Sequence, residues 1–152
     1  MDRIKKNELA TTDLREFFQN HHDKLLCTAN KNGEPSISLM GTPRIIENGN
    51  IEFELSDDPS ITLNNLLENK SVVFMVYEAA SRARDYKGVR IYAEVTEILR
   101  EGEKLAQIRT KIREKYGNEK ADELVATVTC EIKKLRPIVD RGQEWNELPV
   151  LA

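Results

Sequence analysis

Apolar and polar residues alternate along several short segments between Leu25 and Ile98, a pattern typical of β-strands that bury one face. The alternation is cleanest in Ile51–Leu55, and Ser36–Met40 places serines between its apolar residues. Turn-forming residues separate the segments, above all Asn48-Gly49-Asn50, which is typical of a tight hairpin. The sequence therefore predicts a compact antiparallel sheet. Its other expected strands cover Leu25–Ala29, Arg44–Ile46, Ser71–Tyr77 and Val89–Ile98, and a final strand alternates over Val128–Ile132 before Pro137 closes it.

Two further patterns complete the expected fold. Ser71–Tyr77 is continuously apolar after its first residue, so we expect both faces of that strand to be covered. Apolar residues at helical spacing predict three helices, over Thr12–Asn20, Pro59–Asn69 and Gly102–Tyr116. Asp58 or Ser60 is expected to cap the second helix, and Gly117 to end the third.

Length and charge narrow the class of protein. The 152 residues are expected to form a single domain, with an N-terminal helical segment over 1–22 and a C-terminal tail over 139–152. A net charge of −3 argues against general nucleic-acid binding. Cys27 and Cys130 lie far apart without metal-site spacing, so we expect no metal and two small buried thiols. No apolar run is long enough for a bilayer, and no secretory segment is recognisable, which predicts a cytoplasmic protein without membrane association.

Candidate chemistry is sparse. Motifs of common hydrolases and nucleotide-binding loops are absent, so any catalysis is expected to depend on a bound cofactor. The best local site is the segment 56–65, where a helix start offers backbone N–H groups and hydroxyls to an anion and Arg44 adds charge. Simple N-capping beside a surface arginine is the alternative interpretation. Trp145 either stacks on a flat ring or packs at a subunit contact.

Several segments, taken in order, carry a family resemblance that covers Leu25 to Trp145. They are LLCTANKNGEPSIS with its Gly-x-Pro turn, MGTPRIIENGNIEFELS, PSITLNNLLENKSVVFMVY, GVRIYAEVTEI and KLRPIVDRGQEW. Together they resemble the FMN-binding split β-barrel family related to pyridoxamine 5′-phosphate oxidase. The resemblance implies a mainly β fold, a six- or seven-stranded antiparallel split barrel with peripheral helices. It also implies a homodimer with FMN at the interface.

The resemblance further implies a set of cofactor-binding residues. These are Ser60 and Thr62 at the phosphate, Arg44 near the basic position of the preceding hairpin, Ser56 and Asp57 flanking the phosphate end, Met40, Gly41 and Thr42 along the flavin ring, and Arg84 and Trp145 from the facing loop or the second subunit. In that arrangement Arg84 would favour the anionic reduced flavin by Coulombic attraction.

The chain also departs from the family pattern. The phosphate segment of the family usually carries Lys or Arg beside the serine, where this chain has Ile61 and Thr62. Two alternatives therefore stay open: FMN binds weakly, or F420 or haem occupies the site in its place. The arginine-rich C-terminal motif of true pyridoxamine 5′-phosphate oxidases is not recognisable, so that activity is not expected.

The function that the resemblance implies is that of an FMN-dependent oxidoreductase. Hydride would pass through flavin N5 to or from an unidentified small-molecule substrate or electron donor, and no catalytic side chain is assigned. Two alternatives stay open: a non-catalytic binding or electron-transfer module, and a cofactor-free structural dimer.

Overall fold

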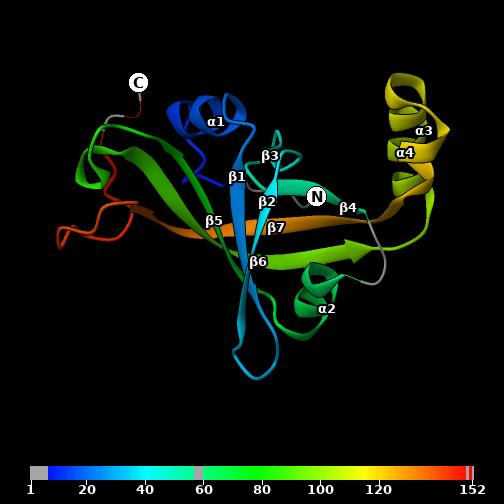
Figure 1. Ribbon diagram of the computed structural model, residues 1–152, viewed down its shortest axis with the longest axis horizontal. Coiled ribbons are helices and arrows are strands. Elements are labelled where there is room, and N and C mark those ends of the chain that lie inside the picture. The colour runs from blue at the N-terminus through cyan, green and yellow to red at the C-terminus, as the bar shows by residue number, and fades with distance from the viewer. Residues whose placement is uncertain (1–6, 57–59, 150, 152) are drawn as a thin grey trace, which may run out of the picture.

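The structure, a computed structural model, describes residues 7–56, 60–149 and 151. Within these ranges, seven antiparallel strands form one strongly curled sheet in the order β2-β1-β5-β6-β7-β4-β3 (Figure 1). The strands are β1 (Lys24–Ala29), β2 (Pro35–Met40), β3 (Arg44–Ile45), β4 (Ile51–Ser56), β5 (Ser71–Glu78), β6 (Lys87–Leu99) and β7 (Leu124–Pro137). The prediction of a mainly β, seven-stranded antiparallel architecture is confirmed.

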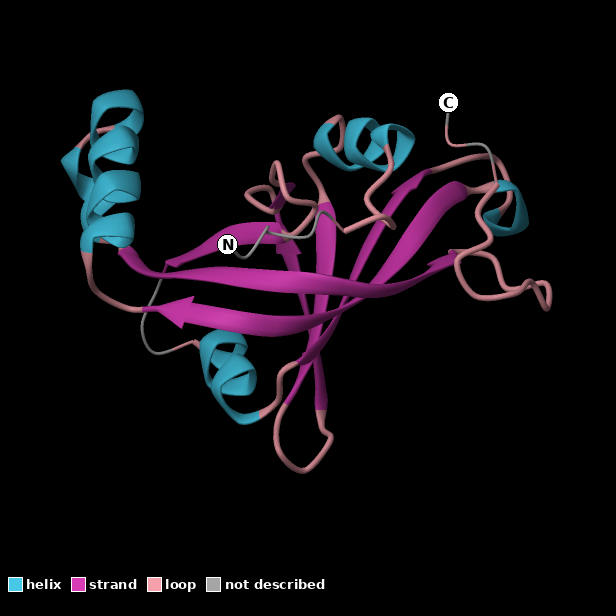
Figure 2. Cartoon of the chain, turned by 180° about the vertical axis from the view of Figure 1, so that it is seen from behind, coloured by secondary structure: helices cyan, strands magenta, loops and turns pink. Residues whose placement is uncertain are grey.

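Helices lie around the sheet rather than within it (Figure 2). They are α1 (Thr12–Gln19), α2 (Ile61–Glu68), α3 (Glu103–Tyr116), α4 (Asn118–Asp122) and the 3₁₀ turn η1 (Ala83–Asp85). Ser60 caps α2, and Gly117 ends α3 with a φ of 96°. Pro59, the predicted first residue of α2, lies outside the described residues. None of the helices described is both long enough and apolar enough to cross a lipid bilayer.

Aromatic rings meet at the centre of the core, on the concave side of the sheet. Phe74 of β5 contacts Phe18 of α1 and Phe53 of β4 edge to face, with ring centroids 6.1 and 5.8 Å apart. All three side chains are fully buried, so α1 covers one opening of the curled sheet. Cys130 of β7 is buried as predicted, and burial raises the pKa of its thiol to about 12. Cys27, in contrast, is only half-buried.

Strand β5 differs from the prediction that both of its faces are covered. Val72, Phe74 and Val76 are buried, but the alternate residues are only half-buried. At one end of this second face, Tyr77 stacks on Tyr86 beside η1, with ring centroids 5.6 Å apart. The α-helices of the described residues make no extensive contact with the face, so the apolar character of Val73 is unexplained by the single chain.

Helices α3 and α4 form an arm that connects β6 to β7 and projects from the sheet (Figure 1). Leu105, at 0% exposure, is the buried side chain of α3. Two polar contacts fasten the base of the arm: Lys104 Nζ lies 2.9 Å from a Glu52 carboxylate oxygen, and Arg109 donates to the carbonyl of Leu124 at 2.7 Å. The arm thus rests on the ends of β4 and β7 through a few residues near its base.

Candidate functional site

Hydroxyl groups gather where α2 begins. Ser60 is the N-cap residue, and its hydroxyl oxygen accepts a hydrogen bond from the backbone N–H of Leu63 at 3.0 Å. That bond confirms the capping interpretation, but the hydroxyl keeps its own proton for donation to an anion. Thr62, the second residue of the helix and only 9% exposed, has its hydroxyl 2.8 Å from the Ser38 hydroxyl on β2. Two predicted phosphate-contacting residues therefore lie together at the positive end of a helix.

Three polar residues beside Thr62 and Ser60 had not been assigned to a site from the sequence: Ser38, Asn65 and Thr28. Ser38 lies opposite the buried Leu26 of β1, so its side chain faces the concave side of the sheet. Deeper on that side, the Asn65 amide donates to the Thr28 hydroxyl at 3.0 Å. The alternation of serines in 36–40 placed Ser38 on one strand face, but only the structure shows that α2 covers that face.

Arg44, the predicted source of positive charge, is held by two carboxylates. Its Nη2 donates to Glu52 at 2.6 Å, and its Nη1 and Nη2 donate to Glu54 at 2.8 and 2.9 Å. The Glu52 and Glu54 side chains are 11% exposed, and Lys104 completes the cluster from α3. Among the contacts of the described residues, none joins Arg44 to the Ser38–Thr62 pair. The positive charge of Arg44 is therefore already balanced within the protein.

The cluster makes a prediction about acid stability. Burial by itself would raise the pKa of Glu52, but the hydrogen bond from Lys104 and the charge of Arg44 outweigh it and hold that pKa below its ordinary value of 4.5. A carboxyl with a lowered folded-state pKa stabilises the fold above its unfolded pKa, and this contribution is lost as the pH falls through the folded one.

We therefore expect Glu52→Gln to lower the free energy of unfolding by about 1–3 kcal/mol at pH 7, because ionic hydrogen bonds are lost. Urea unfolding at a series of pH values should show this difference shrinking as the pH falls below the ordinary glutamate pKa of 4.5. Glu131→Gln is the control and should cost little at any pH, because this half-exposed carboxylate has Lys133 as its one ion-pair partner among the described residues. A Glu52→Gln deficit that stays constant down to pH 3 would contradict the ion-pair explanation.

The remaining residues predicted at the phosphate and ring lie along the edges of β2, β3 and β4. Met40 ends β2 and is half-buried. Gly41 follows it, and Thr42 is exposed, with its hydroxyl 3.5 Å from the Glu54 carbonyl. Ser56 is exposed at the end of β4, next to a register shift against β7. Asp57 lies outside the described residues.

The segments that carry Arg84 and Trp145, the connection between β5 and β6 and the segment after β7, lie at the other end of the molecule from α2 (Figure 1). Arg84 belongs to η1, between β5 and β6. Trp145 packs on its own chain: its ring meets Tyr92 edge to face at 5.2 Å, and the Lys134 ammonium lies 4.0 Å from the ring centroid. One chain therefore does not bring these two residues to the α2 hydroxyls, and their predicted contribution from a second subunit stays a prediction.

The convex side of the sheet near β2 is apolar and open. Ile37 and Leu39 of β2 are 69% and 71% exposed. They lie opposite Cys27 and Leu25 of β1, and Val73 of β5 continues the row beside Cys27. We call these five residues the apolar face. A contiguous exposed apolar surface of this kind is typical of a protein–protein contact.

The chain matches one protein family and shares its fold with several solved structures. The family model described as pyridoxamine 5′-phosphate oxidase matches residues 10–138. No curated protein matches the chain in sequence. Among solved structures, an FMN-binding protein from Syntrophomonas wolfei subsp. wolfei superposes with a TM-score of 0.63 and 20% identity, over 85% of this chain and 86% of that chain.

Two other solved structures share the fold. The heme storage protein HutZ from Vibrio cholerae gives a TM-score of 0.62 at 20% identity, over 82% of this chain and 91% of that chain. An F420 reductase gives 0.59 at 11% identity, over 80% and 94% of the two chains. At such identities the likeness establishes the split-barrel fold, which the curled sheet displays. With the family match running from α1 through the end of β7, the chain belongs to the pyridoxamine 5′-phosphate oxidase family.

Proposed function

We propose that this protein is an FMN-binding flavoprotein that works as an oxidoreductase. The observation that carries the proposal is the hydroxyl cluster of Ser60, Thr62 and Ser38 at the start of α2. Backbone N–H groups at a helix start and nearby hydroxyls are good donors to a phosphate. The FMN-binding protein with the same fold supports the choice of ligand.

The residues fit the phosphate by hydrogen bonding more than by charge. Ser60 and Thr62 would donate to its oxygens, while Ser38 orients the Thr62 hydroxyl from the neighbouring strand. Arg44 would act at longer range, because Glu52 and Glu54 already bind both of its terminal nitrogens. Bound FMN supplies hydride transfer, and the role of this chain is to hold and orient it.

A second copy of the chain is part of the proposal. The apolar face leaves Ile37 and Leu39 more than two-thirds exposed, and Val73 of β5 beside them is only half-buried. A partner chain packed there would bury both. A homodimer in which Arg84 and Trp145 approach the flavin from the partner would also bring together the two ends of the predicted site.

A second candidate function is a binding dimer without turnover, holding F420 or haem, or no cofactor. The balanced charge of Arg44 favours it, because the α2 start then offers a phosphate no full positive charge from that residue. The absorbance spectrum of the purified protein separates these cases, since FMN, F420 and haem absorb differently. A colourless protein that does not respond to added FMN would leave the cofactor-free dimer.

The main test is a titration with FMN followed by quenching of flavin fluorescence. Thr62→Ala removes one hydroxyl donor, and we expect the Kd to rise about tenfold, the effect of losing roughly 1.4 kcal/mol. Thr110→Ala is the matched control, because that exposed threonine of α3 bonds only to its own helix. Equal Kd values for Thr62→Ala and the wild type would contradict the proposed phosphate site.

A further inference from the structure

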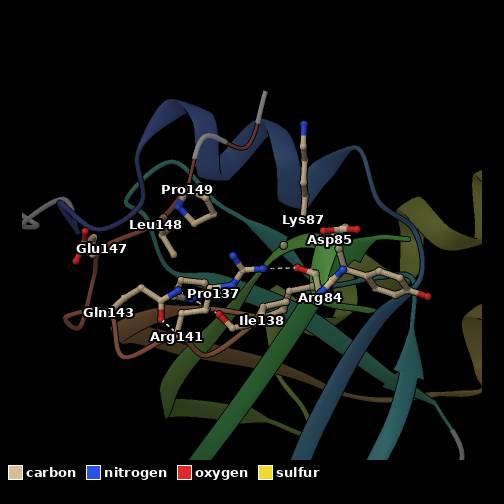
Figure 3. A pocket seen from close by; sticks show the side chains of 13 residues that line it. Arg84, Asp85, Lys87, Pro137, Ile138, Arg141, Gln143, Glu147, Leu148 and Pro149 are labelled. Atoms are coloured by element: carbon tan, nitrogen blue, oxygen red, sulfur yellow. Dashed lines mark hydrogen bonds between the residues drawn. The ribbon is translucent and has the colours of Figure 1, made fainter. Parts of the chain in front are cut away.

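The turn between β1 and β2 carries an Asn-Gly pair, Asn32-Gly33, at the tip of the hairpin. In Figure 1 this tip lies at the bottom of the molecule, away from the connection between β5 and β6. The cavity of about 500 Å³ in Figure 3 belongs to that connection, and it is lined by Arg84, which is already predicted at the flavin. Both residues of the Asn-Gly pair are exposed, and the proposed flavin site uses neither.

An asparagine that precedes a glycine can modify itself in water. The backbone nitrogen of the glycine attacks Cγ of the asparagine side chain and forms a new C–N bond. The side-chain nitrogen takes up the proton that the glycine nitrogen loses and leaves as ammonia. Water then opens the five-membered imide at either carbonyl, which yields aspartate or isoaspartate and one more negative charge. Glycine favours the attack because no Cβ hinders the approach of its nitrogen.

The Asn32 side chain is unrestrained, although the turn around it is well defined. Asn30 holds the turn: its side-chain oxygen accepts from the backbone N–H groups of Asn32 and Glu34 at 2.9 and 3.0 Å. Within the described ranges, the Asn32 carboxamide itself makes no hydrogen bond. A Cβ atom at Gly33 would have no neighbour within 4 Å. The rotation that brings Cγ of Asn32 to the Gly33 nitrogen therefore meets no obstacle.

The chain contains a second Asn-Gly pair, Asn48-Gly49, and this one is enclosed. The Asn48 side-chain oxygen accepts from the N–H of Asn50 at 3.0 Å, and its backbone carbonyl accepts from the N–H of Asn7 at 2.9 Å. Gly49 is buried, and a Cβ atom there would lie 2.8 Å from Cβ of Asn7 and 3.1 Å from Cβ of Ala10. The segment before α1 must move away before this pair can react. Each 1.4 kcal/mol, roughly, that such an opening costs slows the reaction tenfold.

The two turns are otherwise alike. Gly33 and Gly49 both have a positive φ, of 80° and 89°. Their backbone N–H groups donate to the carbonyls of Asn30 and Ile46 at 3.0 and 2.9 Å. This bond must break in both turns before the glycine nitrogen can attack, so it does not distinguish them. The packing around each pair therefore determines which of them reacts.

We propose that Asn32 is a site of spontaneous deamidation in the folded protein and that Asn48 is protected from it. The reaction needs only water, so it is independent of FMN and of the proposed function. Its product affects α2, because the hairpin tip is fastened to that helix: the N–H of Lys31 donates to a carboxylate oxygen of Glu68 at 3.1 Å. Isoaspartate adds one carbon atom to the backbone within this turn, so the turn and its contact with α2 must rearrange.

Peptide mapping by mass spectrometry, after incubation of the full-length protein at mildly alkaline pH, tests the proposal. We expect the peptide with Asn32 to convert to its aspartyl and isoaspartyl forms about tenfold or more faster than the peptide with Asn48. In a denaturing concentration of urea the two rates should approach each other, because only the local sequence then matters. The second pair is thus a control within the same molecule.

Asn32→Gln is the matched variant, because glutamine keeps the carboxamide but its extra methylene prevents the five-membered ring. Ion-exchange chromatography should show an acidic form that accumulates in the wild type and is largely lost in Asn32→Gln. Asn64→Gln, at an exposed position of α2, should leave that form unchanged. An acidic form that accumulates equally in Asn32→Gln would place the main reaction at another residue and contradict the proposal.

Two results of the peptide mapping would also overturn it. If Asn32 and Asn48 convert at the same rate in the folded protein, the packing around Gly49 gives no protection. If Asn32 stays intact in the folded protein while urea allows both peptides to convert, the bond between Gly33 and Asn30 is enough to block the reaction. Neither result depends on whether the protein binds FMN.

Discussion

Replacing Leu39 with aspartate is expected to convert a dimer of this protein into a folded monomer. Leu39 is 71% exposed on β2, at the edge of the sheet, and faces away from the core. A charge there costs the single chain little, but burying it against a second apolar face would leave an unpaired carboxylate without water. Size-exclusion chromatography with light scattering should therefore report the mass of one chain for Leu39→Asp and of two chains for the wild type.

The control for this experiment is Tyr116→Asp. Tyr116 is also a large exposed apolar residue, at 64%, but it lies at the end of α3 on the projecting arm. The Tyr116→Asp variant should therefore still show the mass of two chains. Because the proposed flavin site needs both protomers, Leu39→Asp should also lose FMN binding while its circular dichroism stays native. A Leu39→Asp protein that is still dimeric would exclude the apolar face as the interface, and a monomeric wild type would exclude the dimer.

Adding a single methyl group at Gly88 is expected to cost about 3 kcal/mol of the free energy of unfolding. Gly88 lies on β6 opposite Tyr77 of β5. A Cβ atom there would lie 2.3 Å from the carbonyl oxygen of Val76 and 2.8 Å from the Cα of Tyr77. Both are backbone atoms of a paired strand, so they cannot move aside without breaking the β5–β6 ladder. Urea unfolding of Gly88→Ala measures the loss.

Gly41→Ala is the matched control. A Cβ atom at Gly41 meets only one neighbour, the carbonyl oxygen of His22, at 3.2 Å, so a small shift relieves the contact. We expect this variant to lose less than about 1 kcal/mol. If both alanine variants unfold at the same urea concentration as the wild type, the backbones of β5 and β6 do not approach each other at Gly88 as closely as described here.

The sequence predicted the strands well where apolar and charged residues alternate strictly. Ile51–Leu55 is such a strand, and β4 covers the same residues, although Arg44 and Lys104 cover its glutamates where water was expected. The predicted alternation from Val128 was too short at the start of β7, which begins at Leu124, while Pro137 ends the strand as predicted. Lys133 and Lys134 interrupt the apolar alternation after Ile132. Lys133 lies at a register shift against β6, but Lys134 is paired with Tyr92 again while its side chain reaches solvent. Cross-strand pairing therefore continues where hydropathy gives no signal.

The candidate site was less predictable, because its chemistry depends on register between strands. Ser60 as a cap follows from local sequence, and the structure confirms it. Arg44 was expected to face a phosphate, but the pairing of β3 with β4 places it opposite Glu52, and Glu54 lies two residues further on the same face. No local pattern reveals which side chain a neighbouring strand will present. For β5, the second apolar face predicted a covering element, and composition alone does not say whether that element belongs to the same chain.

The arm of α3 and α4 can change in length at its tip without affecting the rest of the fold. Its tip is a turn at Gly117, and it is fastened near its base by Lys104, Leu105 and Arg109. Residues added or deleted around that tip change neither the ladder between β6 and β7 nor the packing of the three phenylalanines. The tip is thus a site where insertions can accumulate, and where a reporter group can be attached, without disturbing the barrel.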